Sequence, residues 1–187
     1  MLTFDDETHT YFWNGTKVPG VSEFLSESGL KPAGNFYAPG AAERGTEIHE
    51  LTELFDLGLI ELSSPIVAQS SDVVQGHLRA WERFRRETGF QPHQVELRVC
   101  NPVLWLAGTI DRVGTISGTR VKVDLKTGSK ANWHRYQLAA YNLITDNRDP
   151  RYCVYTKADG TYKIQPWADD TDHLEVIRAL SRLRGVA

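Results

Sequence analysis

The chain has 187 residues, of which 41% are hydrophobic and 24% are charged, and its formal net charge is −3 at pH 7. These values are typical of a globular protein and exclude low-complexity and collagen-like chains, so one domain spanning 1–187 is expected. No apolar run approaches the roughly 20 residues of a membrane span. The first residues lack the basic and apolar regions of a signal peptide, so a cytoplasmic location is expected.

Cysteine content and charge limit the classes of site that the chain can hold. Cys100 and Cys153 are its two cysteines, and two thiolates cannot supply an iron–sulfur cluster or an all-cysteine zinc site. Both cysteines fall at or in predicted strands and are expected to act as small apolar residues. The small negative net charge is not a global nucleic-acid signature, but it leaves room for a local basic groove beside an acidic site.

The N-terminal segment predicts a β-hairpin followed by a short helix and a loop. Residues 8–13 and 16–18 flank Asn14-Gly15, which is a strong two-residue turn signal. Ser22 is expected to cap a short helix. The stretch 28–40 contains three glycines and two prolines, which predicts a loop.

Two helices are predicted next. Residues 41–57 carry apolar residues at spacings of three and four, before Gly58, namely Ile48, Leu51, Leu54 and Phe55. Asp72 is expected to cap a second helix that ends near Thr88, before Gly89. Its apolar stripe would consist of Val74, Leu78, Trp81 and Phe84.

Strands dominate the second half of the chain. Alternating and apolar runs predict strands at 95–99, 104–113 and 121–126, then a helix at 131–145. A hairpin around Asp159-Gly160 would join strands 152–156 and 162–165. The last predicted element is an amphipathic helix at 169–184 whose apolar stripe consists of Leu174, Ile177, Leu180 and Leu183.

This order of elements predicts an α+β (mixed α/β) fold in which a central mixed sheet is flanked by helices and preceded by an N-terminal β-hairpin. The expected layout is a hairpin and loop over 1–40, a core over 41–166 and a C-terminal helical segment over 167–187.

Asp111, Asp124 and Lys126 are the most informative residues. Paired carboxylates hold hard divalent cations, which polarise a phosphate and lower the pKa of bound water. A nearby lysine stabilises developing negative charge. Strand pleating puts Asp124 and Lys126 on one face. Taken alone, Asp111 would be a strand-end turn residue, and Asp124 and Lys126 a surface pair.

Five motifs in this order resemble the PD-(D/E)XK nuclease superfamily, in particular its RecB-like exonuclease branch, over roughly half of the chain. Each motif is weak alone, and the ordered set is specific. The motifs are Gly45 four residues before His49, Glu96 on the first core strand, Gly108-Thr109-Ile110-Asp111, Asp124-Leu125-Lys126, and Gln137 four residues before Tyr141. The absence of four cysteines makes the chain similar to small, phage-type members without a cluster.

The resemblance implies a restriction-endonuclease-like core and assigns a role to each matching residue. Asp111, Asp124, the Leu125 carbonyl and His49 would bind one ion, and Glu96 a second ion or its waters. Lys126 would orient or activate water, and Gln137 with Tyr141 would position water or phosphate. The imidazole of His49 suits Mn²⁺ better than Mg²⁺, and both ions are expected to work. Purely structural roles are the alternative: His49 would pair with Glu53, Glu96 would be an exposed strand residue, and Tyr141 would pack on the sheet.

DNA contacts are expected from Arg44, by resemblance, and from the segment after the aspartate-x-lysine strand. Lys130, Trp133, His134 and Arg135 combine cations with an aromatic residue, which suits backbone contact and base stacking. The same four residues are equally compatible with ordinary surface.

The resulting hypothesis is a metal-dependent DNA exonuclease that uses Mg²⁺ or Mn²⁺, has no iron–sulfur cluster, and acts in recombination, repair or DNA degradation. Its partners would be DNA and, as an open option, a recombination or single-strand-binding protein. A structure-specific or nicking endonuclease on the same fold is one alternative. A non-catalytic DNA-binding or partner-binding module is another, and the presence of every expected ligand argues against it.

Overall fold

The computed structural model describes residues 1–33 and 39–185. Within these two ranges the chain forms a three-stranded sheet, a five-stranded sheet and six helices. None of the described helices is both long enough and apolar enough to cross a membrane. Residues 34–38, in the middle of the predicted loop, lie outside the described residues.

The N-terminal residues form a small antiparallel sheet of three strands, β1 (Leu2–Asp5), β2 (Thr10–Trp13) and β3 (Thr16–Val18). The predicted hairpin is β2–β3, and its turn places Asn14 and Gly15 at φ 50° and 80°. These positive φ values are those of a tight turn whose twist matches the strands. Strand β1 was not predicted.

The helices are α1 (Val21–Glu27), α2 (Ala41–Asp56), α3 (Pro65–Gln69), α4 (Asp72–Thr88), α5 (His134–Ile144) and α6 (Thr171–Leu183). The short helix α3 was not predicted. Two predicted caps were wrong: α1 begins directly after Gly20, and the hydroxyl of Ser71, not the Asp72 carboxylate, accepts the Val74 amide of α4 at 3.4 Å. Helix α5 begins three residues later than predicted.

The large sheet is mixed, as predicted, with the order β4-β5-β6-β7-β8. All neighbouring strands are antiparallel except β6 and β7, and α5 provides the crossover that a parallel pair requires. The strands are β4 (Gln91–Asn101), β5 (Leu106–Ile116), β6 (Thr119–Lys126), β7 (Arg151–Thr156) and β8 (Tyr162–Pro166).

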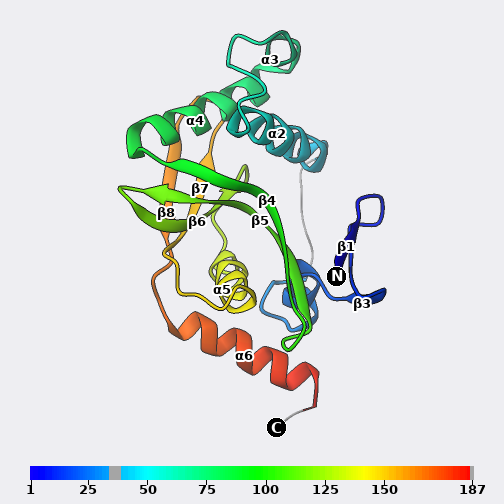
Figure 1. The fold of residues 1–187 in the computed structure, drawn as a ribbon. Coiled ribbons are helices and arrows are strands. Elements are labelled where there is room, and N and C mark those ends of the chain that lie inside the picture. Colours follow the sequence, from blue (N-terminus) through cyan, green and yellow to red (C-terminus); the bar gives the residue numbers. More distant parts are fainter. Residues whose placement is uncertain (34–38, 186–187) are drawn as a thin grey trace.

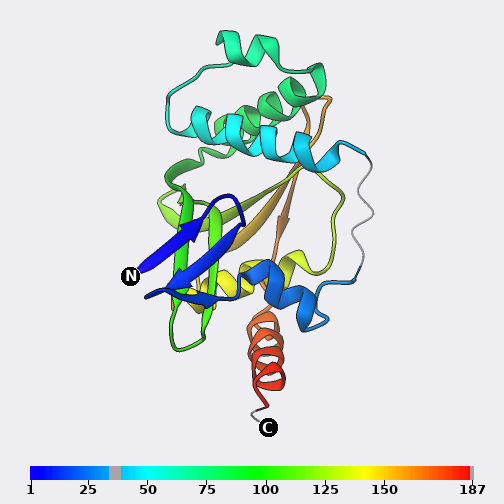
Figure 2. The same cartoon turned by 90° about the vertical axis from the view of Figure 1, so that its right-hand side faces the viewer.

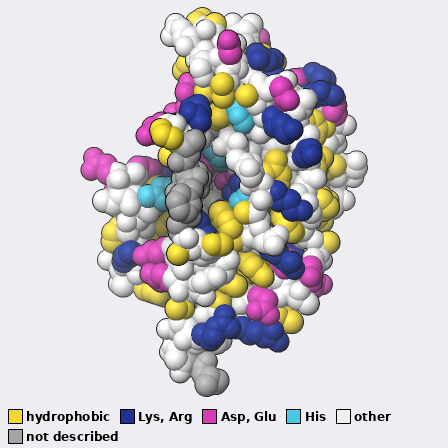
Figure 3. Space-filling view, turned by 180° about the vertical axis from the view of Figure 1, so that it is seen from behind, with side chains coloured by type: hydrophobic (Ala, Val, Ile, Leu, Met, Phe, Trp, Pro, Cys, Tyr) yellow, Lys and Arg dark blue, Asp and Glu magenta, His cyan; other side chains and the backbone are white. Residues whose placement is uncertain are grey.

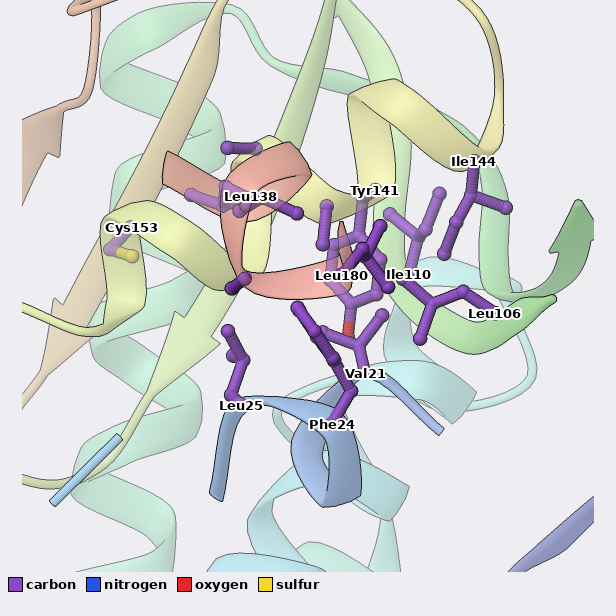
Figure 4. Packing of buried hydrophobic residues seen from close by; sticks show 14 of the residues in the cluster. Val21, Phe24, Leu25, Leu106, Ile110, Leu138, Tyr141, Ile144, Cys153 and Leu180 are labelled. Atoms are coloured by element: carbon purple, nitrogen blue, oxygen red, sulfur yellow. The ribbon is translucent and has the colours of Figure 1, made fainter. Parts of the chain in front are cut away.

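Helices cover both faces of this sheet (Figures 1 and 2). Val121, Val123 and Leu125 of β6 pack in one core with residues of α2 and α4. The other face packs against α1, α5 and α6, and Figure 4 shows Phe24, Leu138 and Leu180 converging there from the three helices. Strand pleating therefore points the even-numbered residues of β6, including Asp124 and Lys126, towards the α5 layer.

The predicted apolar stripe of α6 was wrong except at Leu180. Leu174, Ile177 and Leu183 are 51%, 41% and 48% exposed, whereas the buried apolar residues of the helix are Val176, Ala179 and Leu180. Asp172 is also buried and pairs with Arg135 and Arg151. These ion pairs fix the rotation of the helix, because a buried carboxylate without a cation is costly, and the smaller side chains face the core.

Candidate active site

The candidate site lies where β5 and β6 separate. Their antiparallel ladder ends at the pair Arg112–Val123, so Asp111 and Asp124 occupy the next pair of opposed positions, beyond the last backbone pairing. The carboxylate of Asp111 instead accepts the backbone N–H of Leu125 at 2.8 Å. This contact satisfies a buried N–H donor where the two strands separate, and it fixes the orientation of the Asp111 side chain.

Glu96 extends this row of acidic residues to a third strand. The β4–β5 register pairs Val95 with Arg112 and Leu97 with Ile110, which places Glu96 opposite Asp111. The backbone of Glu96 has φ 47°. A left-handed conformation is costly for a non-glycine residue inside a strand, and this strain indicates that the surrounding contacts hold Glu96 in place.

His49 reaches the acidic row from α2. Its Nδ1 lies 3.8 Å from the Asp111 carboxylate and 4.0 Å from that of Glu96. One ligand atom from each of the three residues lies within 4.8 Å of the others. Carboxylate oxygens and an imidazole suit a divalent cation of the Mg²⁺ or Mn²⁺ type, so the predicted ligands His49, Glu96 and Asp111 are brought together.

Asp124 stands beside this group and not within it. Its Oδ2 lies 2.6 Å from the ammonium of Lys126, while its buried Oδ1 has no hydrogen-bond partner within residues 1–33 and 39–185. An unpartnered buried carboxylate oxygen is costly, and a cation between Asp124 and Asp111 would satisfy it. The residues present therefore fit a bound metal ion.

A chain of hydrogen bonds connects Lys126 to α5. The Lys126 ammonium donates to the Gln137 side chain at 3.0 Å, and the amide of Gln137 donates to the Tyr141 hydroxyl at 3.1 Å. Gln137 and Tyr141 share one helix face because they are four residues apart. Figure 4 shows Tyr141 among the packed hydrophobic residues of the core.

Burial and mutual charge perturb the pKa values in this cluster. Burial raises the pKa of the Asp124 carboxyl above its usual range, and the charge of Lys126 offsets only part of that effect. Burial lowers the pKa of His49, but the Asp111 and Glu96 carboxylates outweigh it, so the net shift is upward. The carboxylates thus attract positive charge, whether a proton or a metal ion.

Arg112 supports the site, and the sequence analysis did not identify it. This fully buried arginine donates to Glu96 at 2.8 Å, to the Asp111 carbonyl at 2.7 Å and to Thr52 at 3.2 Å, and it pairs with Asp56 at the end of α2. The signal in the sequence was a charged residue between Asp111 and Val113, on the strand face opposite Asp111.

A pocket of about 520 Å³ opens over the ligand group. Its far wall comes from the N-terminal sheet, which lies beside the β4–β5 hairpin in Figure 2. Phe4, His9 and Tyr11 of this wall form an aromatic cluster, and the Tyr11 hydroxyl shares a 2.8 Å hydrogen bond with Thr109. Because these residues precede the family motifs, the motifs gave no signal for them.

The predicted DNA-contact residues lie in different surroundings. Arg44 and Lys130 are exposed, and Trp133 is partly buried, with the Lys126 ammonium 5.6 Å from its ring centre. His134 is buried, and its Nδ1 lies 2.7 Å from the Tyr155 hydroxyl. Arg135 pairs with Asp169 and Asp172. Arg44 and Lys130 are therefore the exposed members of the set, although Lys130 also donates to Gln165.

Comparisons with known proteins show the fold and the family of this chain. An alkaline exonuclease from Laribacter hongkongensis, LHK-Exo, aligns at 16% identity with a TM-score of 0.49, over 89% of this chain and 85% of that one. Its complex with dAMP aligns at 16% identity with a TM-score of 0.50, over 90% and 86%; at this identity the likeness shows the fold alone. A search of curated protein sequences finds no match. The sequence model of the PD-(D/E)XK nuclease superfamily matches residues 26–166, which is most of the chain, and the protein belongs to that superfamily.

Proposed function

We propose that this protein is a metal-dependent DNA exonuclease. The observation that supports the chemistry most directly is the convergence of His49, Glu96 and Asp111 beside the Asp124–Lys126 pair. Membership of a nuclease superfamily and the fold shared with the LHK-Exo complex agree with it.

His49, Glu96, Asp111 and Asp124, with the Leu125 carbonyl, would hold one or two Mg²⁺ or Mn²⁺ ions. A bound divalent ion supplies Lewis-acid activation of the phosphate and lowers the pKa of water. Lys126, fixed by Asp124 and Gln137, would orient the attacking water and stabilise charge on the phosphate. Gln137 and Tyr141 hold the position of Lys126. In-line attack would then release a product with a 5′-phosphate.

The pocket favours an end-directed enzyme over an endonuclease. Its volume of about 520 Å³ is typical of a small-molecule site, which suits a terminal nucleotide. The N-terminal sheet walls the pocket on one side, and the carboxylates of Glu50 and Glu53 line it. Negative charge disfavours a phosphate backbone that continues past the reacting nucleotide.

We further propose that residues 1–187 act as one nuclease domain, with the N-terminal hairpin and loop (1–40), a core (41–166) and a C-terminal helical segment (167–187). Arg44, Lys130 and Trp133 would contact DNA, while His134 and Arg135 would position the segment that carries them. The proposed setting is DNA recombination, repair or degradation in the cytoplasm, with a recombination or single-strand-binding protein as a candidate partner.

A degradation assay tests the proposal. Linear duplex, linear single strand and closed circular DNA, with each linear substrate labelled at either end, would be incubated with Mn²⁺ or Mg²⁺ and with wild type or Asp124→Asn. The expected result is metal-dependent loss of linear DNA alone, slowed by about 10²–10³ in Asp124→Asn. Cleavage of circles would support the endonuclease, and wild type that leaves every substrate intact would overturn the proposal.

A further inference from the structure

One surface beside the site carries three cations without an ion-pair partner among the described residues. Most surface arginines pair locally, for example Arg83 with Glu87 and Arg86 with Glu82. Among the described residues, Arg79, Lys157 and Lys163 are exposed cations for which no carboxylate lies within 4.0 Å. We call these three residues the β8-edge strip.

Two of these cations, Arg79 and Lys157, lie on adjoining segments, because helix α4 touches the β7–β8 turn. A Cβ placed on Gly76 would lie 1.7 Å from the Ala158 carbonyl oxygen, and one on Gly160 would lie 3.9 Å from the Arg79 Cβ. Lys157 begins this turn, and Lys163 follows on β8, opposite Tyr155. In Figure 3, Lys and Arg side chains gather along the side of the molecule that carries α4 and β8.

The strip also adjoins the catalytic centre. The hydroxyl of Thr156, the last residue of β7, shares a 2.8 Å hydrogen bond with Nδ1 of His77. The same hydroxyl donates to the backbone carbonyl of Lys126 at 3.4 Å. Arg44 lies close enough to lower the pKa of His77, in addition to the larger effect of burial. At the other end, Lys130 donates to Gln165 of β8. The strip therefore connects two cations already proposed to contact DNA, Arg44 and Lys130.

The chemistry of the strip fits a phosphate backbone, and in the described part of the chain the aromatic side chains next to it offer no stacking platform. The neighbouring tyrosines are held internally: Tyr162 donates to Glu87 at 2.7 Å, and Tyr155 is buried against His134. Single-strand binding depends strongly on exposed aromatic residues, whereas a duplex is held by cations on its phosphates.

We propose that Arg79, Lys157 and Lys163 hold the duplex that flanks the reacting nucleotide, so that the substrate is the end of double-stranded DNA. This inference rests on the proposed function and adds a substrate class and three contact residues to it.

Binding measured without cleavage tests the proposal separately from the chemistry. Fluorescence anisotropy in EDTA, from low to moderate salt, would compare a 20-base-pair duplex with a 20-nucleotide single strand. The variant is Lys157→Gln/Lys163→Gln. The matched control, Arg178→Gln/Arg182→Gln, removes the same charge from α6.

Loss of two phosphate contacts should lower the slope of log K against log salt by about 1.8 for duplex, and low-salt duplex affinity should fall at least tenfold. Single-strand binding and the control should change less than twofold. An unchanged duplex slope, an equal loss for single strand and duplex, an equal loss in the control, or a wild type that binds no duplex would each overturn the proposal.

Cleavage of thymidine 5′-monophosphate nitrophenyl ester, which is too short to reach the strip, should proceed at the wild-type rate in the variant with Mn²⁺. A wild type that binds duplex through the strip but cleaves neither ester nor DNA would contradict the proposed function and leave the duplex surface supported.

Discussion

At the scale of single residues, Lys126 is a positive charge held in place among acidic residues. Its ammonium contacts the Asp124 carboxylate and the Gln137 amide oxygen. Burial lowers the pKa of Lys126, but the Asp124 and Asp111 carboxylates outweigh burial, and the net shift of the pKa is upward. A lysine so placed remains protonated and cannot ligate a metal ion. The roles of charge and ligation can therefore be separated by mutation.

Lys126→Met keeps the aliphatic stem and removes the charge. Cleavage of linear DNA is expected to fall by about 10²–10³, while Mn²⁺ binding measured by calorimetry persists, because the ligand group is intact. Asp124→Asn serves as the comparison, and it should weaken metal binding as well as cleavage. If Lys126→Met abolished Mn²⁺ binding, the lysine would instead be organising the metal ligands.

At the scale of elements, periodicity and turn chemistry predicted most of the fold. The stripe of α4 and the Asn14-Gly15 turn were confirmed because the local pattern and the tertiary environment agree. The stripe of α6 was wrong because Asp172 is buried by distant arginines, which periodicity does not encode. Strand β1 and helix α3 were missed because each has no more than five residues, too few for a periodic signal.

The candidate site, like the fold, was predictable from the sequence only in part. The motifs identified His49, Glu96 and Asp111, which the structure brings together. Arg112, Asp56 and the aromatic wall of the N-terminal sheet act through contacts between segments far apart in the chain, and no spacing rule marks such contacts. The proposed roles of individual residues remain predictions.

Two helix glycines should respond to alanine in opposite ways. Alanine is intrinsically favoured over glycine inside a helix by about 1 kcal/mol. A Cβ on Gly45 would make an ordinary 3.7 Å contact with Thr127, whereas one on Gly76 would overlap the Ala158 backbone. Gly45→Ala is therefore expected to keep or raise the urea midpoint, and Gly76→Ala to lower stability by about 1–3 kcal/mol. A neutral Gly76→Ala would show that the β7–β8 turn moves freely away from α4.

Arg112 joins α2, β4 and β5, and its loss should be costly. Arg112→Met would leave the fully buried carboxylate of Asp56 with Trp81 and Arg85 as its remaining partners among the described residues. Removing one member of a buried pair costs about 3–5 kcal/mol, which urea unfolding would measure. The control is Arg98→Met, whose exposed pair with Asp6 should contribute about 1 kcal/mol or less. Similar losses for both variants would mean that Arg112 contributes only by packing.

At the scale of the whole molecule, the catalytic strand β6 lies between two layers that have different chemistry. The side chains of β6 that face α2 and α4 are Val121, Val123 and Leu125, whereas those that face α5, such as Lys122 and Lys126, bond to polar groups of that helix. His134 belongs to this second layer. Burial, together with the charges of Lys126 and Lys31, lowers its pKa to about 3, so the folded protein holds a neutral imidazole there. Folding stability is thereby linked to pH.

The sign of this link follows from the direction of the shift. The His134 pKa is lower in the folded state than the ordinary value of 6.5. Between pH 6.5 and about 3 the unfolded chain therefore binds more protons than the folded chain. The stability that His134 contributes at pH 7 is lost as the pH falls through that window. For one histidine the slope is at most about 1.4 kcal/mol per pH unit, and less where water reaches the ring. His49 and Asp124, whose pKa values are raised, change stability with pH in the opposite direction. The effect of His134 is therefore isolated by comparing wild type with a His134 variant.

Urea unfolding of wild type and His134→Gln at pH 7.0 and 5.5 would measure that difference. Glutamine does not titrate and can still bond to Tyr155. It is expected to cost stability at pH 7.0, where the neutral histidine fits its site, and to cost about 1 kcal/mol less at pH 5.5, where the unfolded wild type gains a proton that the variant cannot bind. If the two proteins lost stability in parallel, His134 would be protonated in the folded state, and water would have to reach the α5 layer beside Lys126.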